Sequence, residues 1–214
     1  MARRRLDKYY TPPPVTMALL ERIETNEHFP HTTAAEPCAG AGWISQVLEE
    51  YQYGTITGEV EPEFDADHTV DVFARRANAI YNGVDSIITN PPFLGAPHYV
   101  RRFRSWSPAV ACLLPVTFLE PCSTEEDSSR VDLLKGALSE TIVFPRISFD
   151  RFGSGGAPRT VAWFLWDARP GPARLDFVDR VELEGYAGQL DLLIKETDLT
   201  DDPTATQLEF LDTA

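Results

Sequence analysis

Cysteine is rare in this chain, and long apolar runs are missing. Its 214 residues include three cysteines, Cys38, Cys112 and Cys122, and this odd number at wide spacing favours reduced thiols over a disulfide framework. The four histidines show no ligand spacing with the cysteines, so we expect no metal site. No apolar run is long enough to cross a bilayer, and the basic N-terminal residues are not followed by the apolar core of a signal peptide. We therefore expect a soluble, cytoplasmic protein.

Lysine is also scarce, and charge is unevenly distributed along the chain. Three lysines stand beside sixteen arginines, and the formal net charge is −14, which taken alone argues against a polyanionic partner. However, residues 175–214 carry nine of the fourteen excess negative charges. The rest of the chain keeps three basic clusters, which are Arg3, Arg4, Arg5 and Lys8; Arg101, Arg102 and Arg104; and Arg146, Arg151 and Arg159. We therefore divide the chain into a main domain, residues 1–174, and an acidic C-terminal extension, residues 175–214.

One apolar run ends abruptly at Asn90. Residues 84–89 predict a buried strand, and Pro91 and Pro92 prevent its continuation because neither has an N–H group. The carboxamide oxygen of Asn90 and the carbonyl of Pro91 can accept hydrogen bonds from a planar amine. The ring of Phe93 offers a surface on which a flat group can stack. The sequence therefore predicts a site for a flat, amine-bearing group at the end of this strand.

An acidic residue and two glycines follow an earlier strand. Residues 32–36 predict a strand that ends at Glu36, and residues 43–51 predict a helix. Between them, Gly40 and Gly42 let the backbone approach a ligand, and the helix directs free N–H groups toward the same crevice. A carboxylate at Glu36 would repel a pyrophosphate but suits a cationic ligand. This loop therefore favours a ligand that carries a positive charge.

The next predicted strand, residues 53–62, ends in acids. Glu59 stands where it can accept two hydrogen bonds from ribose hydroxyls, and Glu61 is the alternative for this role. Residues 69–73 predict a third strand, in which Asp71 is either a contact to an adenine amine or a solvent-facing acid. The pattern is typical of a nucleoside site along the carboxyl ends of parallel strands.

The ordered set of these features resembles the class I S-adenosylmethionine-dependent amino-methyltransferases of the DNA adenine-N6 type. Residues 36–42, EPCAGAG, resemble the first cofactor motif, and residues 90–93, NPPF, resemble the catalytic motif. Residues 7–12 resemble the D-x-Y-x-T-P segment that closes over the methionine end of the cofactor in that family. The resemblance implies an α/β, Rossmann-like fold with a mostly parallel central sheet, an antiparallel edge strand and helices on both faces.

The resemblance also implies roles for individual residues. The catalytic residues would be Asn90, Pro91, Pro92 and Phe93. The cofactor, S-adenosylmethionine, would be bound by Tyr10, Thr11, Glu36, Cys38, Gly40, Gly42, Glu59, Asp71, Val72 and Asn90. The substrate would contact Phe93, Phe149, Arg101, Arg102 and Arg151, with Phe152 as the alternative to Phe149.

The activity that the resemblance implies is methyl transfer to the exocyclic 6-amino group of adenine in DNA. That amine is unreachable within a duplex, so the base would be extruded and sandwiched against Phe93. An asparagine at position 90 favours hydrogen-bond activation of the amine over general base catalysis. Cytosine carbon methylation is excluded because it needs a cysteine in this turn. The amines of cytosine, of adenine in RNA and of protein glutamine remain open as acceptors.

The stretch between Asn90 and the predicted strand over residues 160–166 is too short for a large target-recognition domain. We therefore expect a minimal enzyme of relaxed specificity, an enzyme that depends on a specificity subunit, or a homo-oligomer, and no membrane partner. The alternative from another class is a non-catalytic cofactor-binding subunit that acts as an acidic decoy or assembly factor.

The remaining segments predict further elements of the sheet. Helices are expected over residues 15–23, 73–81, 99–106 and 130–138, with an acidic loop over 123–129. Strands are expected over residues 110–119, 141–149 and 160–166. Alternating apolar and acidic residues over 175–184 predict one or two more strands before a mobile end.

Overall fold

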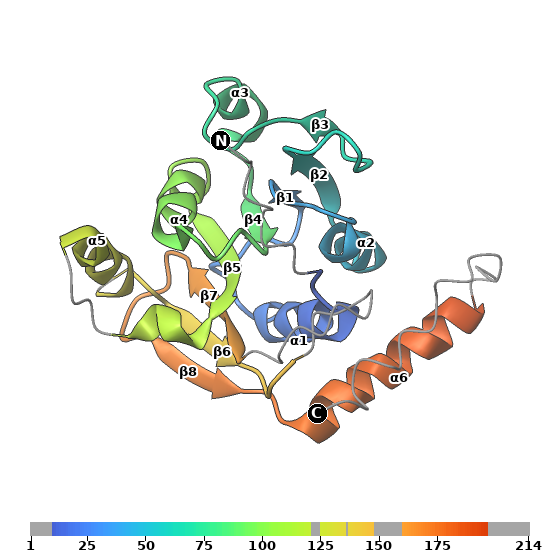
Figure 1. Ribbon diagram of the computed structural model, residues 1–214. Coiled ribbons are helices and arrows are strands. Elements are labelled where there is room, and N and C mark those ends of the chain that lie inside the picture. Colours follow the sequence, from blue (N-terminus) through green and yellow to red (C-terminus); the bar gives the residue numbers. More distant parts are fainter. Residues whose placement is uncertain (1–9, 121–124, 136, 148–159, 197–214) are drawn as a thin grey trace.

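The computed structural model describes residues 10–120, 125–135, 137–147 and 160–196, and its centre is one eight-stranded sheet (Figure 1). The strand order is β3-β2-β1-β4-β5-β7-β6-β8. The strands are β1 (Thr33–Glu36), β2 (Gly54–Glu59), β3 (His68–Thr69), β4 (Ser86–Thr89), β5 (Ala109–Pro115), β6 (Glu140–Val143), β7 (Val161–Trp166) and β8 (Arg174–Phe177). All neighbouring pairs are parallel except those of β7, which runs antiparallel to both β5 and β6. The predicted mostly parallel α/β fold is confirmed.

The middle of the sheet is apolar on both faces. Every residue of β7 is buried, as is β5 up to its terminal Pro115, because helices cover both sides of a parallel sheet. Two tryptophans of β7 point to opposite faces. The indole of Trp163 donates to the carbonyl of Val15 at 2.8 Å, and that of Trp166 donates to the carbonyl of Leu133 at 2.8 Å. The same strand therefore anchors a helix on each face.

Six α-helices of the described chain divide between the two faces of the sheet (Figure 1). One face carries α1 (Pro13–Ile23), α2 (Trp43–Glu50) and α6 (Arg180–Glu196), and the other carries α3 (Ala77–Tyr81), α4 (Ala96–Arg104) and α5 (Glu125–Leu134). Each group packs into its own apolar core against the sheet. No helix in these residues has the length and apolar character needed to span a membrane.

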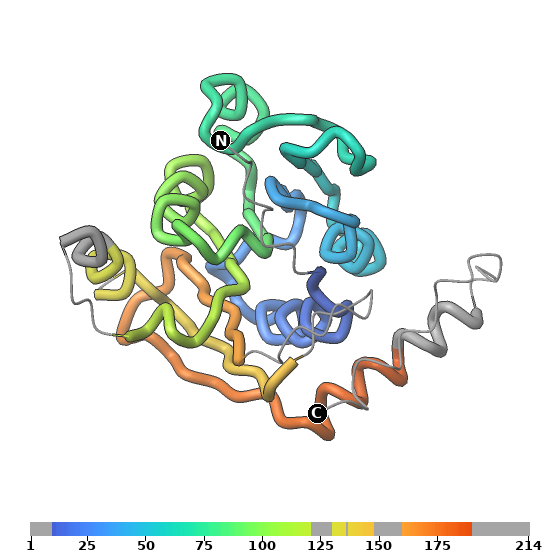
Figure 2. Tube along the Cα trace, in the orientation of Figure 1, coloured from blue at the N-terminus to red at the C-terminus, as the bar shows by residue number. Residues whose placement is uncertain are grey.

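The first and last described parts of the chain lie side by side (Figure 2). Arg22 near the end of α1 pairs with Asp176 of β8 at 2.5 Å and with Glu182 of α6 at 2.7 Å. The hydroxyl of Tyr186 on α6 donates to Glu21 of α1 at 3.0 Å. These contacts join α1 to the elements that follow residue 174.

Several predicted strands are shorter than expected, because local groups end them. The third strand stops at Thr69, and the carboxylate of Asp71 then accepts a hydrogen bond from the N–H of Phe73 at 2.8 Å, which forms a turn. β5 stops at Pro115, and residues Val116–Leu119 form a 3₁₀ helix. β6 ends at Val143, shortly before Pro145.

The C-terminal part of the prediction was wrong in one respect. β8 is a strand, as predicted, but the alternating residues that follow it belong to the helix α6. Leu183 and Tyr186 are buried, whereas Val181 is 77% exposed. The buried positions thus follow the helical period, which the short alternation of four residues concealed. In the same way, α5 begins at Glu125, where the acidic composition had predicted a loop.

Candidate functional site

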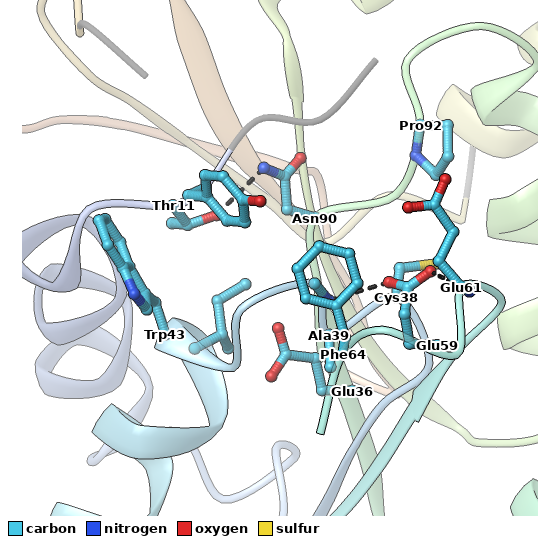
Figure 3. A pocket seen from close by; sticks show the side chains of 13 residues that line it. Thr11, Glu36, Cys38, Ala39, Trp43, Glu59, Glu61, Phe64, Asn90 and Pro92 are labelled. Atoms are coloured by element: carbon cyan, nitrogen blue, oxygen red, sulfur yellow. Dashed lines mark hydrogen bonds between the residues drawn. The ribbon is translucent and has the colours of Figure 1, made fainter. Parts of the chain in front are cut away.

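A pocket lies at the carboxyl ends of β1, β2 and β4 (Figure 3). The order of the strands reverses between β1 and β4, which is where open α/β sheets bind ligands. Eight of the residues predicted for the site line this pocket, and they are Tyr10, Thr11, Glu36, Cys38, Gly40, Glu59, Asn90 and Pro92. The other lining residues are Ala39, Trp43, Ile44, Glu61 and Phe64. The glycine loop and the Asn90 turn therefore share one cavity.

The glycine loop has a left-handed backbone and is tied to β2. Gly40 has a φ of +52° and Gly42 a φ of +76°, values that L side chains rarely adopt. The N–H of Gly40 donates to Oε2 of Glu59 at 2.9 Å, and the N–H of Ala39 donates to the carbonyl of Gly58 at 3.0 Å. Gly42 is the residue before α2 and shapes the turn, so it does not itself line the pocket.

Glu36 presents a buried carboxyl group at the floor of the pocket. Its side chain is only 2% exposed, and Oε2 accepts a hydrogen bond from the N–H of Ser45 at 2.8 Å. Burial raises the pKa of Glu36 well above its ordinary value; the charge of Glu59 adds to this, and the hydrogen bonds from Ser45 oppose it. A cation bound near Glu36 would counter the effect of burial and favour the carboxylate.

Glu59 is held by three backbone N–H groups. Oε1 accepts from Val60 at 2.7 Å and from Glu61 at 3.2 Å, while Oε2 accepts from Gly40. These bonds fix the carboxylate at the end of β2. Oε1 already accepts two hydrogen bonds, whereas Oε2 accepts one and keeps a lone pair for a ligand hydroxyl. Glu61, the alternative for this role, also lines the pocket.

Cys38 lies in the glycine loop and lines the pocket as well. Burial, followed by the charge of Glu59, raises the pKa of its thiol well above the ordinary value. The group therefore stays a neutral thiol at physiological pH, and it lines the pocket without acting as a nucleophile. A nucleophilic thiolate would need the opposite shift.

Three aromatic rings form one side of the pocket. The Tyr10 ring lies 5.8 Å from the Trp43 ring and 6.5 Å from the Phe64 ring, measured between centroids. A Cβ atom at Gly40 would lie 3.6 Å from the Tyr10 ring, so the loop and this ring approach closely. The sequence did not single out Trp43 or Phe64 for the site. Trp43 directly follows the glycine loop, which was a usable signal, whereas Phe64 stands in a segment without a motif.

The Asn90 turn is held by the segment that precedes α1. Nδ2 of Asn90 donates a hydrogen bond to the hydroxyl oxygen of Thr11 at 3.1 Å. Thr11 is 3% exposed, and Pro91 within the turn is buried. In this orientation, Oδ1 is the acceptor end of the Asn90 carboxamide.

A second, open concavity adjoins the other side of the same turn. It is lined by Phe93, Pro115, Val116, Thr117, Leu119, Glu120, Arg146 and Thr160. Asn90 and Pro92 line the first pocket and Phe93 lines the second, so the four-residue turn stands between two cavities. This arrangement can place one molecule beside Asn90 and another beside Phe93 of the same turn.

Some predicted site residues lie outside both cavities. Asp71 is exposed and closes its own turn, and Val72 is buried in the core beneath α4. The guanidinium of Arg102 donates to the carbonyls of Val72 at 3.1 Å and Ala74 at 3.3 Å, and it lies over the Trp106 ring at 4.8 Å. Arg102 thus holds the turn after β3, and this geometry does not support a phosphate contact.

Arg101 stands on the same helix, 3.9 Å from the carboxylate of Asp132 on α5. The predicted substrate residues Phe149 and Arg151, with the alternative Phe152, lie outside the described residues. Within the described ranges, no cluster of three or more histidine, cysteine or acidic side chains could hold a metal ion.

No protein-family model and no curated protein sequence matches the chain, but solved structures share its fold. The methyltransferase subunit of a type I restriction-modification system from Streptococcus thermophilus aligns with a TM-score of 0.61 and 14% identity, over 89% of this chain and 57% of its own. The modification subunit of a proposed type I restriction enzyme from Vibrio vulnificus aligns with a TM-score of 0.58 and 14% identity, over 88% and 53%. A proposed RNA methyltransferase from Pyrococcus horikoshii gives a TM-score of 0.53 and 18% identity, over 76% and 87%.

These likenesses show that the chain has the fold of class I S-adenosylmethionine-dependent methyltransferases. The chain spans just over half the length of the two restriction-modification subunits.

Proposed function

We propose that the protein is an S-adenosylmethionine-dependent methyltransferase that methylates the exocyclic 6-amino group of adenine in DNA. One observation carries the proposal: Gly40 of the glycine loop and Asn90 of the NPPF turn line the same pocket. A methyl donor held by the first and an amine held by the second would therefore lie close together, as a direct transfer requires.

The pocket fits this cofactor chemically. When bound, S-adenosylmethionine supplies a methyl group on a positively charged sulfur atom. Glu36 offers a buried carboxyl group whose desolvation a cation would offset, and Glu59 offers a fixed carboxylate for ribose hydroxyls. Tyr10, Trp43 and Phe64 add an aromatic wall that suits both a flat ring and a cation.

The NPPF turn supports the acceptor side of the reaction. Oδ1 of Asn90 and the carbonyl of Pro91 can accept the two N–H groups of a planar amine, whose lone pair is otherwise delocalised into the ring. Holding both protons favours a more tetrahedral nitrogen and directs its lone pair toward the donor. The concavity beside Phe93 supports an extruded base, because the ring can stack there while the amine reaches Asn90.

Nucleic acid is the favoured substrate class. Arg146 stands exposed at the rim of the concavity beside Phe93, where a phosphate of a bound strand would gain from its charge. Two of the solved structures with this fold are named as restriction-modification subunits, which favours DNA, and one is named for RNA. Because this chain spans only part of those subunits, a partner that supplies sequence specificity, or a second copy, belongs to the proposal.

The decisive experiment measures transfer of labelled methyl from the cofactor to DNA, RNA and protein glutamine, with N90A as the test variant. We expect label in DNA, recovered as N6-methyladenine after digestion, and a loss of at least about 100-fold in N90A. The matched control is N82A, since Asn82 is exposed and lies outside the pocket. Label found only in RNA or only in protein would show that the substrate is RNA or protein, and not DNA. Cofactor binding without transfer to any acceptor would instead support the acidic decoy or assembly subunit.

A further inference from the structure

The hydrogen bond between Thr11 and Asn90 joins two segments that are distant in the sequence. Thr11 precedes α1 and Asn90 follows β4, yet Nδ2 of Asn90 lies 3.1 Å from Oγ1 of Thr11. Both residues line the pocket, and the Thr11 side chain is 3% exposed (Figure 3). A hydrogen bond at this depth is poorly replaced by water when one partner is removed.

The orientation of the Asn90 carboxamide matters because its two ends have opposite hydrogen-bonding character. An amine that is to be held by its N–H groups needs the oxygen of the carboxamide, whereas the NH₂ end would meet it donor to donor. The side chain has nearly the same shape in both orientations, so packing alone does not select one. The Thr11 hydroxyl can accept from Nδ2 or donate to Oδ1, so it holds the carboxamide in place, and the N–H groups of the amine select the orientation that presents Oδ1.

We propose that Thr11 is a positioning residue, whose hydroxyl holds the carboxamide of Asn90 in place and accepts from Nδ2 when Oδ1 meets the acceptor amine. The proposal rests on the proposed function and gives Thr11 a role toward the acceptor, distinct from the cofactor contact that the sequence predicted. Thr11 also links the acceptor side of the site to the cofactor side, because the neighbouring Tyr10 ring packs in the aromatic wall of the cofactor pocket.

Three variants isolate the hydroxyl group. T11V has nearly the same shape as threonine but cannot accept a hydrogen bond, and T11S keeps the hydroxyl while losing the methyl group. T16V is the matched control on the adjacent helix, because Thr16 is fully buried and its hydroxyl has no hydrogen-bond partner among the described residues. All three are compared at equal folded fraction, checked by urea unfolding.

The first readout separates binding from turnover. We expect kcat at saturating cofactor to fall by at least about tenfold in T11V, in line with the loss of one buried hydrogen bond. The Kd for the cofactor should change by less than about twofold, and T11S and T16V should keep most of the wild-type kcat. A T11V enzyme with unchanged kcat and weakened cofactor binding would overturn the proposal in favour of a cofactor contact.

The second readout does not depend on activity. The side-chain NH₂ of Asn90 can be identified in a ¹⁵N spectrum by its loss in N90D, and its hydrogen exchange can then be followed. We expect exchange to accelerate at least about tenfold in T11V and to stay unchanged in T11S and T16V. Unchanged exchange in T11V overturns the proposal even if the enzyme is active. If the wild type methylates nothing, the proposed function fails, while the exchange measurement still decides whether Thr11 holds the Asn90 carboxamide in place.

Discussion

Among the described glycines, Gly58 is the position at which an added methyl group would make the closest contact. A Cβ atom added there would lie 1.8 Å from the hydroxyl oxygen and 3.1 Å from Cζ of Tyr81, and 3.5 Å from Cγ1 of Val70. Real Cβ atoms essentially never approach a heavy atom within 3.0 Å. Tyr81 is fully buried against Trp106, so its ring cannot swing into solvent to make room.

The cost of G58A follows from this geometry. Overpacking a core costs typically about 1–3 kcal/mol, and a clash with a buried ring belongs at the upper end, so we expect a loss of about 3 kcal/mol in the free energy of unfolding. Removing the hydroxyl with Y81F relieves the worst contact and leaves the one to Cζ. Among the described residues this hydroxyl has no hydrogen-bond partner, so Y81F alone should be neutral or stabilising by up to about 1 kcal/mol.

A double-mutant cycle measured by urea unfolding tests this reasoning. The double variant G58A/Y81F should recover about 2 kcal/mol relative to G58A, with an unchanged slope against urea. G54A is the control, because Gly54 is exposed and its added Cβ would keep ordinary contacts of 3.7 Å. A G58A protein as stable as the wild type, or a double variant no more stable than G58A, would refute the argument.

Three further predictions concern buried or paired charges. Burial raises the pKa of Glu36, so protonation of this side chain stabilises the folded state. This stabilisation is complete below the unfolded pKa near 4.5 and is lost as the pH rises through the folded pKa. E36Q should therefore be more stable than the cofactor-free wild type at pH 8, with a smaller difference near pH 4.5, while calorimetry shows cofactor binding weakened at least about tenfold. R22M removes the ion pairs that join α1 to β8 and α6 and should cost about 1–2 kcal/mol in urea unfolding, with faster hydrogen exchange in α6. Hydrogen bonds from Thr57, chiefly its backbone N–H, lower the pKa of Asp67, so the stability it provides is present above pH 4 and is lost as pH falls through the folded pKa. Because Asp67 is exposed, solvent screening weakens this contribution, so D67N should be less stable than the wild type at pH 7 by no more than about 0.5 kcal/mol, and acid titration of the unfolding free energy should bring the two curves together.

Most of the fold could be predicted because strand and helix periods alternate along the first 120 residues. Parallel strands joined by helices leave few sheet topologies open, and fully apolar runs such as β5 identify the centre of the sheet. The ends of elements were less predictable. Pro115 ends β5 because it has no N–H group to donate, and the carboxylate of Asp71 ends its strand by accepting a local hydrogen bond from the N–H of Phe73.

The candidate site was predictable where its residues follow strand ends. Glu36 and Glu59 are the last residues of β1 and β2, and Asn90 directly follows β4; the carboxyl ends of neighbouring parallel strands meet at one edge of the sheet. Phe64 could not be found in this way, because its place in the pocket depends on packing against Tyr10, far away in the sequence. Arg102 is the opposite case. Its charge led us to predict a contact to the substrate, but its guanidinium donates hydrogen bonds to backbone carbonyls.

The acidic C-terminal extension illustrates why composition is a poor guide to a domain boundary. The change in charge suggested a break before residue 175, but that position falls within β8, which pairs with β6. Val178, Leu183 and Tyr186 are buried in the same core as α1. Charge describes the solvent-facing side of a segment, whereas a boundary depends on what its other side buries. The described residues beyond 174 therefore complete the core behind α1, the helix whose first turn follows Thr11.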